Sequence, residues 1–232
     1  MSRISENLQA VHARITAAVS KVSRGAQEIT LLAVSKTFGP QAVTQAYGCG
    51  QRDFGENYLQ EALEKMAAVQ TAAVDAVWHF IGPVQSNKTR PLAESFDWVH
   101  CVDREKIARR LSEQRPEHLL PLNVCIRVKL DDEDSKSGID PEDVAALATL
   151  ILSLPRLRLR GLMAIPAPCA DFDGQRDSFR VLNDLFCTLR NGGMPLDTLS
   201  IGMSADLEAA IAEGATIVRV GSAIFGERKN EQ

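Results

Sequence analysis

The chain has 232 residues and a mass of 25.3 kDa, a length that one α/β barrel can occupy. It is 45% hydrophobic and 24% charged, an ordinary globular balance with enough apolar material for one large core. The formal net charge of −4 gives no basic field that would favour nucleic acid or an anionic membrane as a partner.

The longest apolar run, residues 144–154, is too short to span a bilayer. The first residues follow a helical pattern that includes Glu6, so we expect no signal peptide. Five scattered cysteines contain no Cys-x-x-Cys pair, which argues against a disulfide framework or a zinc ribbon. We therefore expect a cytoplasmic protein whose thiols are reduced and mostly buried.

Strands and helices are predicted to alternate along the chain. An amphipathic helix opens it over residues 4–22, where apolar residues recur at steps of three and four. Eight strands are then predicted at residues 29–34, 53–54, 77–81, 98–102, 122–128, 159–165, 198–201 and 216–220. Helices are predicted from residue 40 and at residues 57–73, 103–111, 140–154, 173–190 and 204–213, with Asn57 and Asp103 as N-caps.

This alternation predicts an α/β protein, a single-domain (β/α)8 TIM barrel over residues 1–232 with an extra N-terminal helix. The units average about 29 residues, which is typical of a compact barrel. A doubly wound open sheet stays an alternative because periodicity does not report closure. The Gly-x-Gly-x-x-Gly pattern of nucleotide-binding sheets does not follow the first strand.

Lys36 is the first candidate functional residue, because it directly follows the first strand and barrels place their chemistry where strands end. Partial burial there favours the neutral amine, and a neutral amine can form a Schiff base with an aldehyde. The plainer interpretation is a lysine that leaves the strand and reaches water.

Small residues follow strands seven and eight. After strand seven, Gly202 offers a bare backbone N–H group and Ser204 a hydroxyl, and Ser204 is also suited to cap the next helix. After strand eight, Gly221 and Ser222 offer the same groups. Barrels frequently bind phosphate with these two loops. The alternative is an ordinary helix cap after a glycine turn.

Strand alternation places Arg219 on the same side of strand eight as Gly221. A buried arginine needs a partner, either an internal carboxylate or an acceptor on a ligand. Pyridoxal 5′-phosphate (PLP) has an aldehyde, a phosphate and a ring nitrogen that match the lysine, the two loops and the arginine.

Ordered motifs covering nearly the whole chain support this interpretation. They are AVSKT at residues 33–37, FGENY at 54–58, WHFIG at 78–82, QSNK at 85–88, VDR at 102–104, SKSG at 135–138, GLMAI at 161–165, GMS at 202–204 and RVGS at 219–222. With these motifs the sequence resembles the YggS/PROSC family of PLP-binding homeostasis proteins. It departs from the family pattern at Ile201, at Pro83-Val84 and at residues 128–130.

The resemblance implies a fold-type III barrel, like the barrel domain of alanine racemase, and a role in intracellular PLP homeostasis. Lys36 is implied as the Schiff-base lysine and Arg219 as the partner of the pyridine nitrogen. The implied cofactor contacts are Lys36, Asn57, Ser200, Gly202, Met203, Ser204, Arg219, Gly221 and Ser222.

Efficient amino-acid turnover is not expected. Arginine stays protonated, so it leaves the pyridine nitrogen unprotonated and the ring a weaker electron sink. Alanine racemase-like enzymes share this arrangement, so it does not by itself exclude racemisation. Racemases of this type add a β-rich domain with a tyrosine base, whereas Tyr47 and Tyr58 both lie early in this chain. A single-domain amino-acid racemase and a Schiff-base aldolase without cofactor are the alternative functions.

Most of the remaining polar residues are interpreted as packing or solvated residues. We interpret His79 as a barrel-packing residue rather than a base, and the spacing of the histidines suggests no metal site. Lys136 lies in an acidic loop, either as a solvated side chain or as a second lysine that captures aldehyde. PLP-dependent apo-enzymes are the expected recipients of the cofactor, and the protein is expected to be a monomer or a weak homodimer.

Overall fold

A computed structural model describes residues 2–130 and 138–227 as a closed barrel of eight parallel strands in chain order. The barrel closes between the last and first strands, where Thr30 lies opposite Ile217 and Ala33 opposite Val220. The strands are β1 (Thr30–Val34), β2 (Asp53–Glu56), β3 (Val77–Phe80), β4 (Trp98–Val102), β5 (Leu122–Arg127), β6 (Leu157–Met163), β7 (Thr198–Ser200) and β8 (Ile217–Val220). This closure confirms the predicted TIM barrel and rules out the open sheet.

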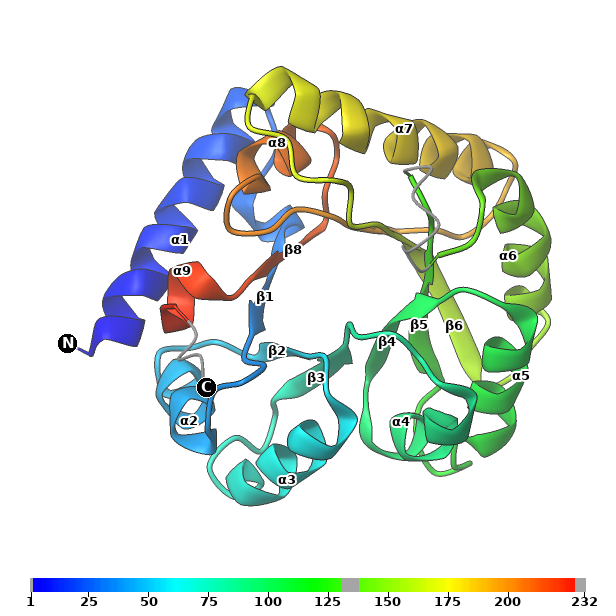
Figure 1. Cartoon of the computed structure of the whole chain (residues 1–232), viewed down its shortest axis with the longest axis horizontal. Helices are drawn as coiled ribbons and strands as arrows, with labels where there is room; N and C mark the ends of the chain where they lie inside the picture. Colours follow the sequence, from blue (N-terminus) through cyan, green and yellow to red (C-terminus); the bar gives the residue numbers. More distant parts are fainter. Residues whose placement is uncertain (1, 131–137, 228–232) are drawn as a thin grey trace.

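Helices surround the barrel (Figure 1). They are α1 (Arg3–Lys21), α2 (Pro40–Gly48), α3 (Leu59–Val69), α4 (Thr89–Ser95), α5 (Glu105–Gln114), α6 (Val144–Leu152), α7 (Phe172–Asn191), α8 (Leu207–Ala212) and α9 (Ser222–Phe225), with single 3₁₀ turns at Ala26–Glu28, Ser86–Lys88 and Pro141–Asp143. The predicted extra helix is α1, which packs against α8, α9 and α2. No helix in the described part of the chain is long and apolar enough to cross a membrane.

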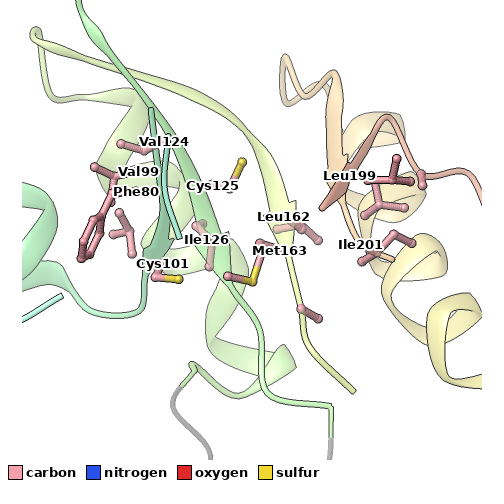
Figure 2. Close-up of a cluster of buried hydrophobic side chains, with 14 of the residues drawn as sticks. Phe80, Val99, Cys101, Val124, Cys125, Ile126, Leu162, Met163, Leu199 and Ile201 are labelled. Atoms are coloured by element: carbon pink, nitrogen blue, oxygen red, sulfur yellow. The ribbon is translucent and has the colours of Figure 1, made fainter. Parts of the chain in front are cut away.

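The strands are rich in apolar residues because both of their faces are buried. Figure 2 shows side chains of β4, β5 and β6 filling the space around the sheet, among them Val124, Ile126 and Leu162. These three side chains are fully buried, and burying a side chain of this size contributes about 1.5–3 kcal/mol relative to leaving it in water. The helices thus pack against a continuous apolar wall that holds the strand ends in place.

Two predicted helix caps are wrong. The residue before α3 is Tyr58 rather than Asn57, and the residue before α5 is Arg104 rather than Asp103. The Asp103 side chain instead accepts a hydrogen bond from the Arg104 guanidinium at 2.7 Å. β2 runs to Glu56, two residues beyond its predicted end, so Asn57 is left at the barrel mouth.

Other helix and strand boundaries differ from the predicted ones because of local hydrogen bonding and strand pairing. α3 ends at Val69, four residues before the predicted end, because the amides of Ala72 and Ala73 both turn back to the Val69 carbonyl oxygen. β6 begins at Leu157, two residues early, where it pairs with Leu122 of β5. The short helices α4 and α9 were not predicted individually, because each is shorter than two full helical repeats.

The expectation of mostly buried cysteines is also wrong. All five are free thiols, but only Cys101 and Cys125 are buried, whereas Cys49 and Cys187 are exposed and Cys169 is intermediate. The two buried thiols lie on β4 and β5 in the barrel wall (Figure 2). Burial raises the pKa of the Cys101 thiol to about 12 and raises that of Cys125 as well, so both are protonated at neutral pH.

Candidate functional site

A pocket of about 300 Å³ lies where the strands of the barrel end at their carboxyl side. Its walls come from the loops after β1, β2, β3, β6, β7 and β8. The lining residues are Val34, Lys36, Phe38, Asn57, Ile81, Ile165, Met203, Ser204, Ala205, Arg219, Gly221, Ser222 and Gly226. The structure therefore brings together seven of the nine residues that the sequence singled out, leaving Ser200 and Gly202 outside the lining.

Lys36 reaches this pocket from the turn after β1, and its backbone is held on both sides. The Lys65 ammonium donates to the carbonyl oxygen of Ser35 at 2.8 Å, and the amide of Thr37 donates to Glu61 Oε1 at 2.6 Å. Thr37 has a φ of 68°, which is a strained conformation for a β-branched residue and persists only where neighbours enforce it. These two bonds therefore position the lysine between them.

The group that enforces this turn is a buried ion cluster, which the sequence did not reveal. Lys65 Nζ lies 2.6 Å from Glu56 Oε1 and 2.9 Å from Glu61 Oε1, and the Ser35 hydroxyl donates to Glu56 at 2.6 Å. Lys65 is 2% exposed and Glu56 is fully buried. The sequence signals for it were the i,i+4 spacing of Glu61 and Lys65 and a glutamate two residues after the second predicted strand.

Burial raises the pKa of the Glu56 carboxyl, and the Lys65 ammonium and the Ser35 hydroxyl oppose that rise. A carboxyl whose pKa is raised on folding contributes stability that is present below its unfolded pKa and lost as pH rises through its folded pKa. The lysine therefore limits the cost of keeping this carboxylate charged in the barrel wall.

Arg219 enters the pocket from β8 and is 4% exposed. Its guanidinium donates to the carbonyl oxygen and the hydroxyl of Ser200, the latter at 3.0 Å, and to the carbonyl oxygen of Ala164 at 2.9 Å. Within the described ranges no carboxylate forms an ion pair with it. Burial lowers the pKa of Arg219 to about 10, so the pocket holds a cation at neutral pH.

The loops after β7 and β8 meet at the pocket wall. The hydroxyl of Ser222 lies 3.3 Å from that of Ser204. A Cβ on Gly221 would come within 3.2 Å of the Val34 carbonyl oxygen, so a side chain there would crowd β1. Two hydroxyls and a bare backbone segment thus face the same space, which is the chemistry that binds an anion.

Ser204 does not cap the following helix, contrary to the sequence prediction. α8 begins three residues later, at Leu207, after Asp206. The Asp206 carboxylate accepts the Met203 amide at 2.5 Å and so ties down the turn that precedes the helix. The Ser204 hydroxyl is therefore available to the pocket.

The remaining two predicted residues lie behind the pocket. Ser200 is fully buried on β7 between Arg219 and His100, with its hydroxyl 2.9 Å from His100 Nδ1. Gly202 has a φ of 90°, and a Cβ there would lie 2.5 Å from the Ala210 Cβ. Gly202 therefore allows α8 to pack closely against the end of β7. A direct ligand contact from Ser200 or from Gly202 stays a prediction.

Asn57 lines the pocket at the end of β2. Its Oδ1 atom is buried without a hydrogen-bond partner in the described part of the chain. An unsatisfied buried acceptor costs about 1–3 kcal/mol, so this atom is a place where a bound ligand or water can donate.

The other candidates fall outside this pocket. His79 is buried on β3 and bonded to His100 and Asp53, as expected of a packing residue. The described residues contain no cluster of His, Cys, Asp and Glu that could hold a metal ion. Lys136 lies outside the described residues.

The fold and the pocket place the chain in the class of alanine racemase-like barrels. Residues 7–229 match the family model described as the alanine racemase N-terminal domain. This match and the closed barrel confirm the predicted fold-type III architecture.

Within that class the comparisons are more specific. The chain is 58% identical to the pyridoxal phosphate homeostasis protein of Pseudomonas aeruginosa, over 98% of this chain and 97% of that one, and 51% identical to that of Escherichia coli K12, over 98% of each. The structure of PipY from Synechococcus elongatus PCC7942 with PLP bound matches with a TM-score of 0.84 and 36% identity, over 96% of this chain and 100% of PipY. The chain belongs to the family of pyridoxal phosphate homeostasis proteins.

Proposed function

We propose that the chain, acting as one domain of residues 1–232, binds PLP reversibly through Lys36 and serves PLP homeostasis without efficient amino-acid turnover. One observation carries this proposal: an amine, a buried guanidinium and two hydroxyls line the same pocket of about 300 Å³. The names of the relatives and the PLP bound to PipY support it.

The residues fit the groups of this cofactor. PLP supplies an aldehyde, a phosphate and a pyridine nitrogen, and its aldehyde carbon would form a C=N bond with Lys36 Nζ as one water is released. Ser204 and Ser222 donate their hydroxyls, and Gly221 its backbone, to the phosphate. Asn57 offers its unsatisfied Oδ1 to a donor in the pocket.

Arg219 would set the protonation state of the bound ring. Three of the five N–H groups of a guanidinium are used by Ser200 and Ala164, which leaves donors for a ring nitrogen. Although burial lowers the pKa of Arg219 to about 10, it remains a donor at neutral pH. The ring nitrogen is then an acceptor without a proton, which weakens electron withdrawal from a substrate. Neither tyrosine lines the described pocket, so no second base of the racemase type faces Lys36 there, and this favours holding over turnover.

The test is a titration of the purified protein with PLP, followed by near-visible absorption. The wild type is expected to develop a Schiff-base band that borohydride bleaches. Lys36→Ala should remove the band, and Lys106→Ala, at an exposed position of α5, should keep it. No band in the wild type would refute the proposal, and a band that survives Lys36→Ala would refute Lys36 as the anchor.

A second measurement separates holding from turnover. Amino acids deuterated at the α-carbon are incubated with the PLP-loaded protein, and loss of deuterium is followed by mass spectrometry. We expect no loss beyond that caused by free PLP. Rapid, protein-dependent loss would instead favour a single-domain racemase.

We further propose that PLP-dependent apo-enzymes in the cytoplasm receive the cofactor, and that the protein acts as a monomer or a weak homodimer. The free state of all five cysteines is consistent with a reducing compartment. Apo-enzyme reactivation faster with PLP-loaded protein than with the same total amount of free PLP would support transfer. Sedimentation velocity over a range of concentrations tests the oligomeric state.

A further inference from the structure

A row of polar side chains crosses the interior of the barrel behind the pocket. The Arg219 guanidinium donates to Ser200 Oγ at 3.0 Å, and Ser200 Oγ lies 2.9 Å from His100 Nδ1. His100 Nε2 lies 2.9 Å from His79 Nδ1, and His79 Nε2 lies 3.1 Å from Asp53 Oδ1. Five side chains on β8, β7, β4, β3 and β2 thus form one continuous hydrogen-bonded chain.

The two ends of this chain face different parts of the molecule. Arg219 lines the pocket at the carboxyl ends of the strands, whereas Asp53 and His79 line a second pocket of about 390 Å³ at the other end of the barrel. Ser200 and His100 are fully buried and His79 is 1% exposed, while the Asp53 side chain is 29% exposed. The Trp98 ring stacks on His79 at a centroid distance of 5.2 Å and holds its plane.

The chemistry of the ends sets the direction of the first and last bonds, and neutral histidine rings then set the direction of the two bonds between them. A guanidinium can only donate and a carboxylate can only accept. If Ser200 Oγ accepts from Arg219 and donates its own hydrogen to His100 Nδ1, then His100 donates from Nε2 to His79, and His79 donates from Nε2 to Asp53. Every acceptor then receives one hydrogen, and both rings are neutral with the proton on Nε2.

The opposite direction leaves a conflict. With His100 protonated on Nδ1 and His79 neutral, the His79 Nε2 lone pair would face the Asp53 carboxylate, and the Ser200 hydrogen would lose its acceptor. Burial together with the neighbouring His79 and Arg219 lowers the pKa of His100 well below its ordinary value, so a charged His100 does not resolve this conflict.

We infer that Ser200, His100, His79 and Asp53 are positioning residues for Arg219: a directed hydrogen-bond chain that links the buried guanidinium to a carboxylate at the opposite end of the barrel and sets its orientation toward the cofactor. The inference rests on the proposed function for its effect on PLP. Arg219 needs such a link because the described residues give it no ion-pair partner, and bonds in a chain polarise one another.

The direction of the chain is tested in the ligand-free protein by nitrogen NMR of the histidine rings. We expect Nε2–H tautomers at both His79 and His100 at neutral pH. An Nδ1–H tautomer at His100, or an imidazolium at His79, would overturn the inference. Because no PLP is present, this result does not depend on whether the proposed function is right.

The effect on the pocket is tested with Asp53→Asn, which removes the accepting charge at a partly exposed position. The amide oxygen of the variant side chain can still accept from His79, but without the charge that strengthens the bond, so PLP should bind about five-fold more weakly. The nitrogen signals of His100 should also change, two links away, which a purely local packing change at residue 53 does not produce. Unchanged PLP affinity together with unchanged His100 signals would overturn the inference.

Asp197→Asn is the matched control. Asp197 lines the same second pocket as Asp53, at the other end of the barrel, but it bonds to Arg160 and Thr198 rather than to His79. Its substitution should leave both PLP affinity and the His100 signals unchanged. If the wild type itself fails to bind PLP, the proposed function is wrong, and the NMR result alone decides on the direction of the chain.

Discussion

Replacing Lys65 by methionine tests whether the buried ion cluster supports the turn at Lys36. The ammonium makes three contacts within 2.9 Å, to the Ser35 carbonyl oxygen and to the carboxylates of Glu56 and Glu61. Methionine replaces most of the aliphatic stem with a flexible apolar side chain. The substitution therefore removes the charge and its hydrogen bonds and leaves only a small change in volume.

The expected loss of folding stability follows from the Glu56 carboxylate that stays buried after the substitution. Glu56 is fully buried, and its Oε2 already lacks a partner in the described residues. Removing one partner of a buried ion pair typically costs about 3–5 kcal/mol, because the other charge stays buried. For a domain of this size each kcal/mol lowers the Tm by about 2–4 °C, so Lys65→Met should lower it by about 6–20 °C.

The pH dependence has a definite sign. The pKa of Glu56 is already raised by burial and is held down by Lys65, so it rises further in Lys65→Met. A carboxyl with a raised folded-state pKa favours folding below its unfolded pKa and loses that contribution as pH rises through its folded pKa. The stability difference between wild type and variant should therefore shrink as pH falls from 7 towards 5.

The assay is chemical denaturation at several pH values. Lys106→Met, at an exposed site, is the matched control and should stay within about 0.5 kcal/mol of the wild type. The double variant Glu56→Gln/Lys65→Met should recover part of the loss because no buried charge is left unpaired. A deficit below about 1 kcal/mol at pH 7, or one that grows on acidification, would refute the reasoning.

Two further predictions concern the β7–α8 junction and the thiols. Gly202→Ala should destabilise the fold by about 1–3 kcal/mol, because residue 202 has a positive φ and an added Cβ would collide with Ala210. The control Gly48→Ala should not destabilise it, because the space around a Cβ at residue 48 is open. Equal denaturation midpoints for the two variants would contradict this prediction. When the native protein is alkylated at pH 8 and analysed by mass spectrometry, the exposed Cys187 should react well before the buried Cys101, whose pKa is raised to about 12. Similar rates at the two thiols would show that Cys101 is accessible.

Much of the site was predictable because its residues sit at fixed offsets from strands. Lys36 follows an apolar run, and Arg219 and Gly221 are two residues apart at the end of another. In a parallel barrel the carboxyl ends of all strands meet at one face, so residues far apart in sequence are brought to one pocket without any knowledge of the contacts. Asn57 was found by family resemblance rather than by this geometry.

The sequence by itself determined the alternation of strands and helices, since periodicity is a local property of the chain. Only the tertiary structure showed that Lys65, on an amphipathic helix, points inward to Glu56 and Glu61, and that Ser200 lies behind the pocket instead of in its lining.

The hydrogen-bonded chain through His79 and His100 shows most clearly what the sequence alone could not determine. The two histidines lie 21 residues apart on separate strands, and the bond from His100 to Ser200 joins residues 100 positions apart. Their partners are set by strand register and barrel closure, because closure decides which inward-facing side chains meet across the interior. The sequence places each residue on its strand, and the tertiary structure decides what that residue bonds to.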